Sequence, residues 1–123
     1  MTISPTARDG LALFIRVGCV HCHNGPLFTD NDFHTIRAPY DPVGGPDHGR
    51  LTGTPRLLAS PFNANGAFSD ARDERLATLT TDPTDDGRFR TPTLRGIAQT
   101  APYTHAGTLP TLESALGSNG SPA

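Results

Sequence analysis

The chain has 123 residues, the size of a single domain, and twelve acidic against ten basic side chains give it a formal net charge of −2. All ten basic residues are arginine and they form no run, which argues against a nucleic-acid-binding protein. No apolar stretch approaches membrane-spanning length, and no signal peptide opens the sequence, so we expect Met1 to replace a removed leader or an upstream domain. Hydrophobic residues make up only 35% of the chain, which leaves little side-chain material for a core.

The first element predicted along the chain is a helix that ends near Gly18. Ser4 is a suitable N-cap, and Pro5 suits the first helical position. Apolar residues then recur at helical spacing, at Leu11, Phe14 and Ile15. We expect this stripe to pack in the core and the helix to lead directly into the segment that begins at Cys19.

That segment, Cys19-Val20-His21-Cys22-His23, has the Cys-x-x-Cys-His spacing of covalent haem attachment. Two thiols separated by two residues can form thioethers with the two vinyl groups at one edge of a porphyrin. His23 follows at once, so its imidazole can serve as the proximal ligand of the iron, while His21 is expected to face solvent. The motif predicts one haem c held by Cys19 and Cys22. Because the chain has little apolar side-chain material of its own, we also expect its folding to depend on haem attachment.

Two other readings of the cysteine pair compete: a thioredoxin-type redox motif, or half of a zinc site completed by His21, His34 or His48. A thioredoxin motif follows a strand and precedes a helix, whereas here a helix precedes the pair and a Gly-Pro turn follows it. Zinc ribbons usually bring a second cysteine pair, and this chain has only two cysteines. Neither reading explains His23, so haem is favoured.

The rest of the sequence predicts an all-α fold with long irregular loops. A Pro-, Gly- and Asp-rich stretch over 38–49 is expected to be a surface loop. Thr91 followed by Pro92 predicts the start of a short helix that carries Leu94 and Ile97 inward. Other short helices are expected at 56–59, 71–77 and 111–116, with a flexible tail over 117–123. The acidic runs over 70–74 and 82–86 are interpreted as solvated faces.

Several further motifs stand in a fixed order along the chain, at 25–30, 33–34, 87–95, 100–107 and 111–113. Together with the haem motif they resemble the C-terminal haem domain of bacterial di-haem cytochrome c peroxidases and MauG-type proteins, over nearly the whole chain. The resemblance implies a cytochrome c-like domain spanning 1–123, taken from a two-domain periplasmic protein. In that family the N-terminal haem reduces hydrogen peroxide and the C-terminal haem passes electrons, so this chain matches the electron-transferring half.

The resemblance also implies a second axial ligand, Met or Tyr, on the helix beyond the histidine matched by His105. The corresponding residue here is Asn119, a poor ligand of haem iron, and the only methionine is Met1. Three explanations remain open: the native ligand lies beyond this fragment, the iron is five-coordinate, or another residue replaces it, from among His105, His34, His48 and Tyr103. Methionine would raise the reduction potential, a second histidine would lower it, and an open site could bind peroxide, carbon monoxide or nitric oxide.

Other site residues follow from the resemblance. Arg95, and less clearly Arg90, are expected to pair with haem propionates. His105 is interpreted as a structural histidine first and a distal ligand second. The backbone carbonyls of Thr100 and Pro102 match positions that help bind calcium between the two domains.

The sequence therefore predicts single-electron transfer to or from a partner haem protein or domain, outside the cytoplasm of a bacterium. One rival is a haem enzyme whose open sixth position reacts with hydrogen peroxide directly, with His105 as the only candidate acid–base group. A second rival is a sensor of diatomic gases.

Overall fold

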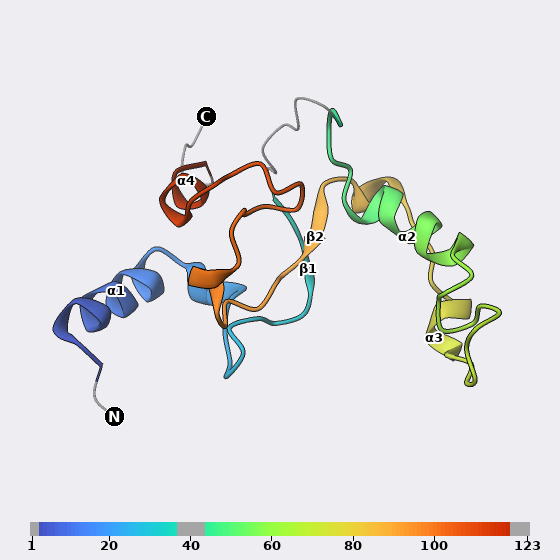
Figure 1. Cartoon of the computed structure of the whole chain (residues 1–123), viewed down its shortest axis with the longest axis horizontal. Helices are drawn as coiled ribbons and strands as arrows, with labels where there is room; N and C mark the ends of the chain where they lie inside the picture. The colour runs from blue at the N-terminus through green and yellow to red at the C-terminus, as the bar shows by residue number, and fades with distance from the viewer. Residues whose placement is uncertain (1–2, 37–43, 119–123) are drawn as a thin grey trace. The chain divides into compact units, whose positions relative to one another are not determined.

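The computed structural model describes residues 3–36 and 44–118. In chain order, with η for a 3-10 helix, the elements are α1 (Pro5–Arg16), η1 (Cys19–His21), β1 (Phe33–Thr35), α2 (Arg50–Ala59), α3 (Glu74–Ala77), η2 (Pro83–Asp85), β2 (Arg88–Arg90), η3 (Ile97–Gln99) and α4 (Leu112–Ser118) (Figure 1). No helix of the described part is both long and apolar enough to cross a membrane.

Helix α1 forms as its sequence predicts. The Ser4 side chain accepts a hydrogen bond from the Ala7 N–H at 3.1 Å, Pro5 occupies the first turn, and the helix ends at Arg16. An N-cap of this kind contributes about 1 kcal/mol to helix stability. Gly18 then adopts a left-handed conformation with φ of 89°, which glycine reaches without steric cost. This turn separates the end of the helix from Cys19, which follows Gly18 directly.

The strands β1 and β2 pair side by side in a two-stranded sheet (Figure 1), a departure from a purely helical fold. The Thr91 N–H donates to the Asp32 carbonyl at 2.9 Å, and the Ile36 N–H donates to the Gly87 carbonyl at 3.1 Å. Residue numbers therefore rise along one strand as they fall along the other, so the pair is antiparallel. Strands of three residues are too short to show alternation in the sequence, which is why the sequence did not indicate them.

The helices of the second half agree only in part with the prediction. Helix α2 begins at Arg50, before the expected 56–59, and α3 is shorter than the expected 71–77. Helix α4 confirms the expected helix at 111–116 and continues to Ser118, into the stretch expected to be a tail. The rest of the expected tail, 119–123, and the first half of the loop expected at 38–49, namely 38–43, lie outside the described residues.

The prediction of a helix that begins at Thr91 is wrong, because residues 91–94 have no helical structure and a turn at Arg95 and Gly96 leads into η3. The Thr91 N–H bonds to Asp32, and the Thr93 hydroxyl donates to the Leu27 carbonyl at 2.6 Å. These partners are distant in sequence, and they hold the segment in a conformation that its local cap-and-proline signal does not favour.

The described residues fall into two compact units. The first unit is made of the described residues of Met1–Phe33 together with Arg90–Thr100. The second unit is made of the described residues of His34–Phe89 and of Ala101–Ala123. The prediction of one domain over 1–123 stays a prediction.

Polar groups, and not apolar ones, occupy the buried positions of the described chain. No described hydrophobic side chain is buried, and the buried residues are Thr54, Asp85 and Thr91. Asp85, in η2, lies 3.0 Å from the Arg50 guanidinium and 3.6 Å from that of Arg88. A charge is retained in such a place because it is paired.

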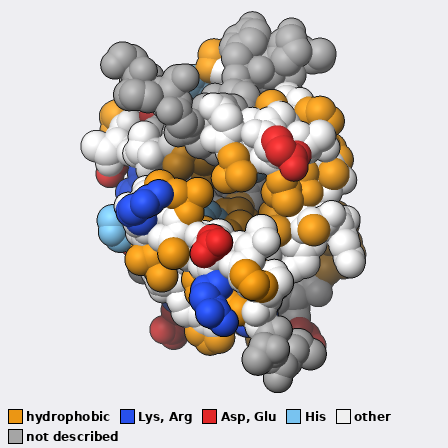
Figure 2. Space-filling model, turned by 90° about the vertical axis from the view of Figure 1, so that its left-hand side faces the viewer, with side chains coloured by type: hydrophobic (Ala, Val, Ile, Leu, Met, Phe, Trp, Pro, Cys, Tyr) orange, Lys and Arg blue, Asp and Glu red, His pale blue; other side chains and the backbone are white. Residues whose placement is uncertain are grey.

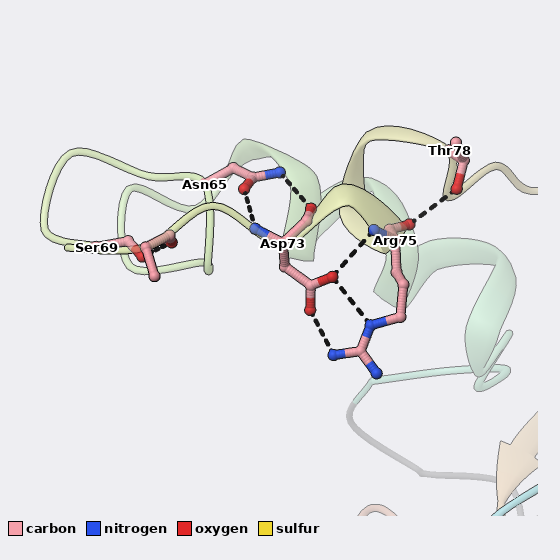
Figure 3. A network of polar contacts seen from close by, with 6 residues as sticks. Asn65, Ser69, Asp73, Arg75 and Thr78 are labelled. Carbon is pink, nitrogen blue, oxygen red and sulfur yellow. Dashed lines mark hydrogen bonds and ion pairs between the residues drawn. The ribbon is translucent and has the colours of Figure 1, made fainter.

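A polar network also organises the stretch between α2 and α3 in the second unit (Figure 3). Asn65 accepts a hydrogen bond from the Asp73 N–H at 2.8 Å and donates one to the Asp73 carbonyl at 3.0 Å. The two Asp73 carboxylate oxygens in turn accept from Arg75 at 2.9 and 2.6 Å, and these bonds hold the pKa of Asp73 below its ordinary value. Because the Arg75 side chain is 90% exposed, this pair contributes little to stability.

Candidate functional site

The two cysteines lie in a tight turn of the first unit, immediately after α1. At the end of η1, the backbone N–H groups of Cys22 and His23 both donate hydrogen bonds to the Cys19 carbonyl. The bond from His23 is 2.9 Å long. Both cysteines are free thiols and both are half-buried, while His21 between them is exposed, as predicted. The turn therefore keeps two thiols and a histidine together on a segment of five residues.

The ring of His23 has a fixed tautomer. Its Nδ1 lies 3.0 Å from the carbonyl oxygen of Phe28. A carbonyl can only accept, so Nδ1 carries the proton and Nε2 keeps its lone pair for a metal. Metal-ligating histidines are commonly oriented in this way by a hydrogen bond from their other nitrogen.

Three consecutive carbonyls of the turn after the motif accept hydrogen bonds from side chains of the first unit. The Pro26 carbonyl accepts from Nε and Nη2 of Arg95 at 2.8 and 2.6 Å, the Leu27 carbonyl from Thr93, and the Phe28 carbonyl from His23. The sequence did not indicate Phe28 or Thr93 as site residues. The carbonyl of Phe28 leaves no trace in residue type, and Thr93 was interpreted as part of a helix.

Exposed apolar side chains lie on α1 and on the turns before and after the motif. On the first unit the large exposed side chains include Leu11 at 44%, Ile15 at 54%, Leu27 at 57% and Val17 at 62%. Hydrophobic side chains are abundant on the surface in Figure 2, with single charged groups between them. One unit thus carries two thiols, an oriented imidazole and exposed apolar side chains. The thiols and the imidazole are the groups that bind a haem c, and the apolar side chains suit its porphyrin, which is a large apolar plate.

The arginines expected at the haem propionates are engaged with backbone and side-chain oxygens. Arg95 holds the Pro26 carbonyl, and its guanidinium lies 5.4 Å from the centre of the Phe28 ring. Arg90 donates from Nη2 to the Asn31 side chain at 2.8 Å. Pairing of either residue with a propionate stays a prediction.

His105 lies in the second unit as a hydrogen-bonded histidine. Its Nδ1 lies 2.5 Å from a carboxylate oxygen of Asp47, and its ring centroid is 5.1 Å from that of Phe89. Its role as a distal ligand stays a prediction. Of the other candidates, His48 pairs with Asp86 at 2.7 Å, and Asn119 lies outside the described residues.

The two predicted calcium ligands belong to different units of the described chain. Thr100 closes the first unit after η3, and its hydroxyl donates to the Ile97 carbonyl at 3.2 Å. Pro102 belongs to the second unit. The calcium site stays a prediction.

Asp47 is expected to make the stability of the folded protein fall at acid pH. Burial raises the pKa of Asp47, but hydrogen bonds from the Gly49 N–H and from His105, with the charges of His105 and His48, bring it below its ordinary value of 3.8. A group whose pKa is lower in the folded state stabilises the fold fully above its unfolded pKa, about 3.9, and this contribution is lost as the pH falls through the folded pKa. The free energy of unfolding of the wild type should therefore exceed that of Asp47→Asn by an amount that shrinks as the pH is lowered below about 4. A difference that grows with acidity would contradict this.

Known proteins are similar to this chain over most of its length. A family model described as RoxA-like, cytochrome c-like matches residues 88–123. Cytochrome-c peroxidase IdrP1 of Denitromonas iodatirespirans is 37% identical over 93% of this chain and 31% of its own length. Methylamine utilization protein MauG of Methylorubrum extorquens is 30% identical over 93% of this chain and 25% of its own length.

A solved structure adds a likeness in three dimensions. The crystal structure of a MauG-like protein associated with microbial copper homeostasis superposes with a TM-score of 0.59 at 27% identity, over 95% of this chain and 31% of that one. The chain thus spans about a third of the length of the first curated relatives it matches, 31% in the case of IdrP1. The aligned relatives, the family model over residues 88–123 and the superposed structure agree, and together they support a cytochrome c-like haem domain similar to those of cytochrome-c peroxidase and MauG proteins.

Proposed function

We propose that this chain is the electron-transferring haem domain of a di-haem cytochrome c peroxidase-like protein, with one haem c bound through thioethers to Cys19 and Cys22 and ligated by Nε2 of His23. The observation that carries the proposal is the hydrogen bond from His23 Nδ1 to the Phe28 carbonyl at 3.0 Å. It leaves Nε2 of His23 as a lone-pair donor on the residue directly after the second thiol. When bound, the haem supplies one-electron redox chemistry at its iron.

The residues of the chain hold and tune this group. Cys19 and Cys22 keep it on the protein even when an axial bond is broken. The hydrogen bond to Phe28 orients the His23 ring and makes its Nε2 a stronger donor. The exposed apolar side chains of α1 and the adjoining turn, Leu11, Ile15 and Val17, would exclude water from the porphyrin, and a lower local polarity shifts the reduction potential.

The role within a larger protein is part of the same proposal. The relatives are named as cytochrome-c peroxidases, and the chain aligns with about a third of them, 31% for IdrP1. We infer that a separate haem domain reacts with hydrogen peroxide and exchanges electrons with this one. A calcium ion held in part by the carbonyls of Thr100 and Pro102 would join the two domains. Covalent haem attachment of this type takes place outside the cytoplasm, so the periplasm is the proposed location.

The test is the absorption spectrum of the purified protein, oxidised and reduced, with and without carbon monoxide. We expect one haem per chain that resists acid–acetone extraction, in a low-spin state that carbon monoxide leaves unchanged. Such a spectrum requires two protein ligands on the iron, as an electron-transfer domain has. A high-spin spectrum that shifts with carbon monoxide would contradict electron transfer as the function, and a protein that binds zinc and no haem would contradict the haem site itself.

A further inference from the structure

We propose that Thr93 and Arg95 are positioning residues for the proximal histidine, and that through the turn 26–28 they set the reduction potential of the haem. The proposal rests on the proposed function, because it requires His23 to ligate the iron. Neither residue needs to contact the haem to act in this way.

The structural basis is the run of three carbonyls at Pro26, Leu27 and Phe28. Arg95 donates to the first through Nε and Nη2, at 2.8 and 2.6 Å, and the Thr93 hydroxyl donates to the second at 2.6 Å. The third accepts from Nδ1 of His23 at 3.0 Å. Each carbonyl lies in its own peptide plane, and successive planes are joined at a Cα atom with only φ and ψ free, so holding the planes of Pro26 and Leu27 restricts the direction of the Phe28 carbonyl.

Backbone bonds within the turn, from the Phe28 N–H to the Gly25 carbonyl at 3.1 Å and from the Thr29 N–H to the Asn24 carbonyl at 2.8 Å, hold its N–H groups, whereas the carbonyls of 26–28 are held by side chains. Pro26 and Leu27 are exposed, so apolar packing contributes little at these positions. Phe28 has φ of 53°, in the left-handed region that residues other than glycine and asparagine rarely adopt. The surrounding structure must over-determine such a conformation for it to persist. Arg95 contributes twice, because its guanidinium also lies 5.4 Å from the centre of the Phe28 ring.

A second contact ties the same two segments together one residue further on. The Thr29 hydroxyl donates to the Thr91 carbonyl at 2.6 Å, and Thr91 is only 8% exposed. The segment 91–95 therefore runs along the turn 26–28 as a clamp, with Thr93 and Arg95 as its two side-chain donors. We call this segment the clamp.

The expected effect on the haem follows from the chemistry of imidazole. A strong hydrogen bond from Nδ1 gives the ring anionic character, and a more basic Nε2 stabilises the ferric state and lowers the reduction potential. Releasing the clamp should weaken the bond to the Phe28 carbonyl, so the potential should rise. Loss of a positive charge near the iron would have the opposite sign, because it would favour the ferric state.

The test compares the midpoint potentials of haem-loaded wild type, Thr93→Val and Arg95→Lys. Valine has the shape of threonine without its hydroxyl, and lysine keeps the charge of Arg95 without its planar fork. Each variant is expected to raise the ratio of reduced to oxidised haem about tenfold at a fixed applied potential, which is about 59 mV for one electron. Thr93→Ser keeps the hydroxyl, so its midpoint potential should equal that of the wild type.

Matched controls lie in the second unit. Thr78→Val removes a threonine hydroxyl that donates to the Arg75 carbonyl at 3.2 Å. Arg75→Lys removes a guanidinium group that donates to the Asp73 carboxylate. Neither should move the potential. Since Thr93 and Arg95 act on one turn, the double variant Thr93→Val with Arg95→Lys should shift the potential by less than the sum of the single shifts.

The possible outcomes separate the two proposals. A wild type without acid-stable haem overturns the proposed function and this inference with it. A haem-loaded wild type whose potential Thr93→Val leaves unchanged overturns the inference alone, and a shift confined to Arg95→Lys would assign Arg95 to a propionate instead. If Thr93→Val does not accumulate with haem, Thr93→Ala takes its place, and an unchanged potential in that variant equally overturns the inference.

Discussion

Replacing Cys19 and Cys22 together by alanine is expected to remove all haem that survives acid–acetone extraction, whereas the wild type retains it. The chain has two cysteines in total, so no other sulfur can form a thioether. Folding should suffer as well, because no described hydrophobic side chain is buried and the apolar face of α1 is left in contact with water. We expect the double variant to lose most of its helical circular dichroism.

The measurement is haem staining of the denatured chain after extraction, with the single variants Cys19→Ala and Cys22→Ala beside the double one. Each single variant keeps one thioether and should retain haem at reduced yield. The matched control is His21→Ala, which changes an exposed residue inside the same motif. Acid-stable haem on the double variant would show that the attachment lies elsewhere.

Replacing His23 by glycine is expected to leave the haem attached but to convert it fully to a high-spin form that binds carbon monoxide. The two thioethers do not depend on His23, whereas the iron loses the imidazole that the Phe28 carbonyl orients. Added imidazole should enter the space left by the side chain and restore the low-spin spectrum. The absorption spectrum with and without imidazole measures both effects on one sample.

The control for this variant is His21→Gly, which places the same flexible residue two positions earlier in the motif and should leave the spectrum unchanged. A low-spin spectrum in His23→Gly without added imidazole would mean that another side chain ligates the iron. Failure of imidazole to change a high-spin spectrum would argue that the site collapses when the ring is removed.

Capping and turn residues in the sequence predicted those helix ends that depend on neighbouring residues alone. The Ser4 cap, Pro5 and the stop at Gly18 are encoded within a few residues of one another, and α1 has the expected bounds. The Thr91–Pro92 signal is of the same kind, yet no helix forms there, because Thr91 and Thr93 bond to Asp32 and Leu27 instead. A cap signal alone does not reveal whether a distant partner will compete for the same groups.

The same limit applies to the candidate site. The spacing of Cys19, Cys22 and His23 indicates haem chemistry because it is a covalent requirement within five residues. The acceptor for His23 is a backbone carbonyl, which every residue has, so only the three-dimensional structure singles out Phe28. Arg95 was expected at a propionate from its residue type, and its bonds to Pro26 depend on a contact that spans 69 residues of sequence.

That separation has a consequence for the order of events when the protein is made. The turn and the clamp are joined by hydrogen bonds between residues 62 to 69 positions apart, so the two segments meet only when the chain folds. The motif by itself needs only five residues to present its thiols. Covalent attachment can therefore precede folding, outside the cytoplasm, on a segment whose histidine is still loosely oriented, and the docking of Thr93 and Arg95 would then fix the ligand geometry as a late step of maturation.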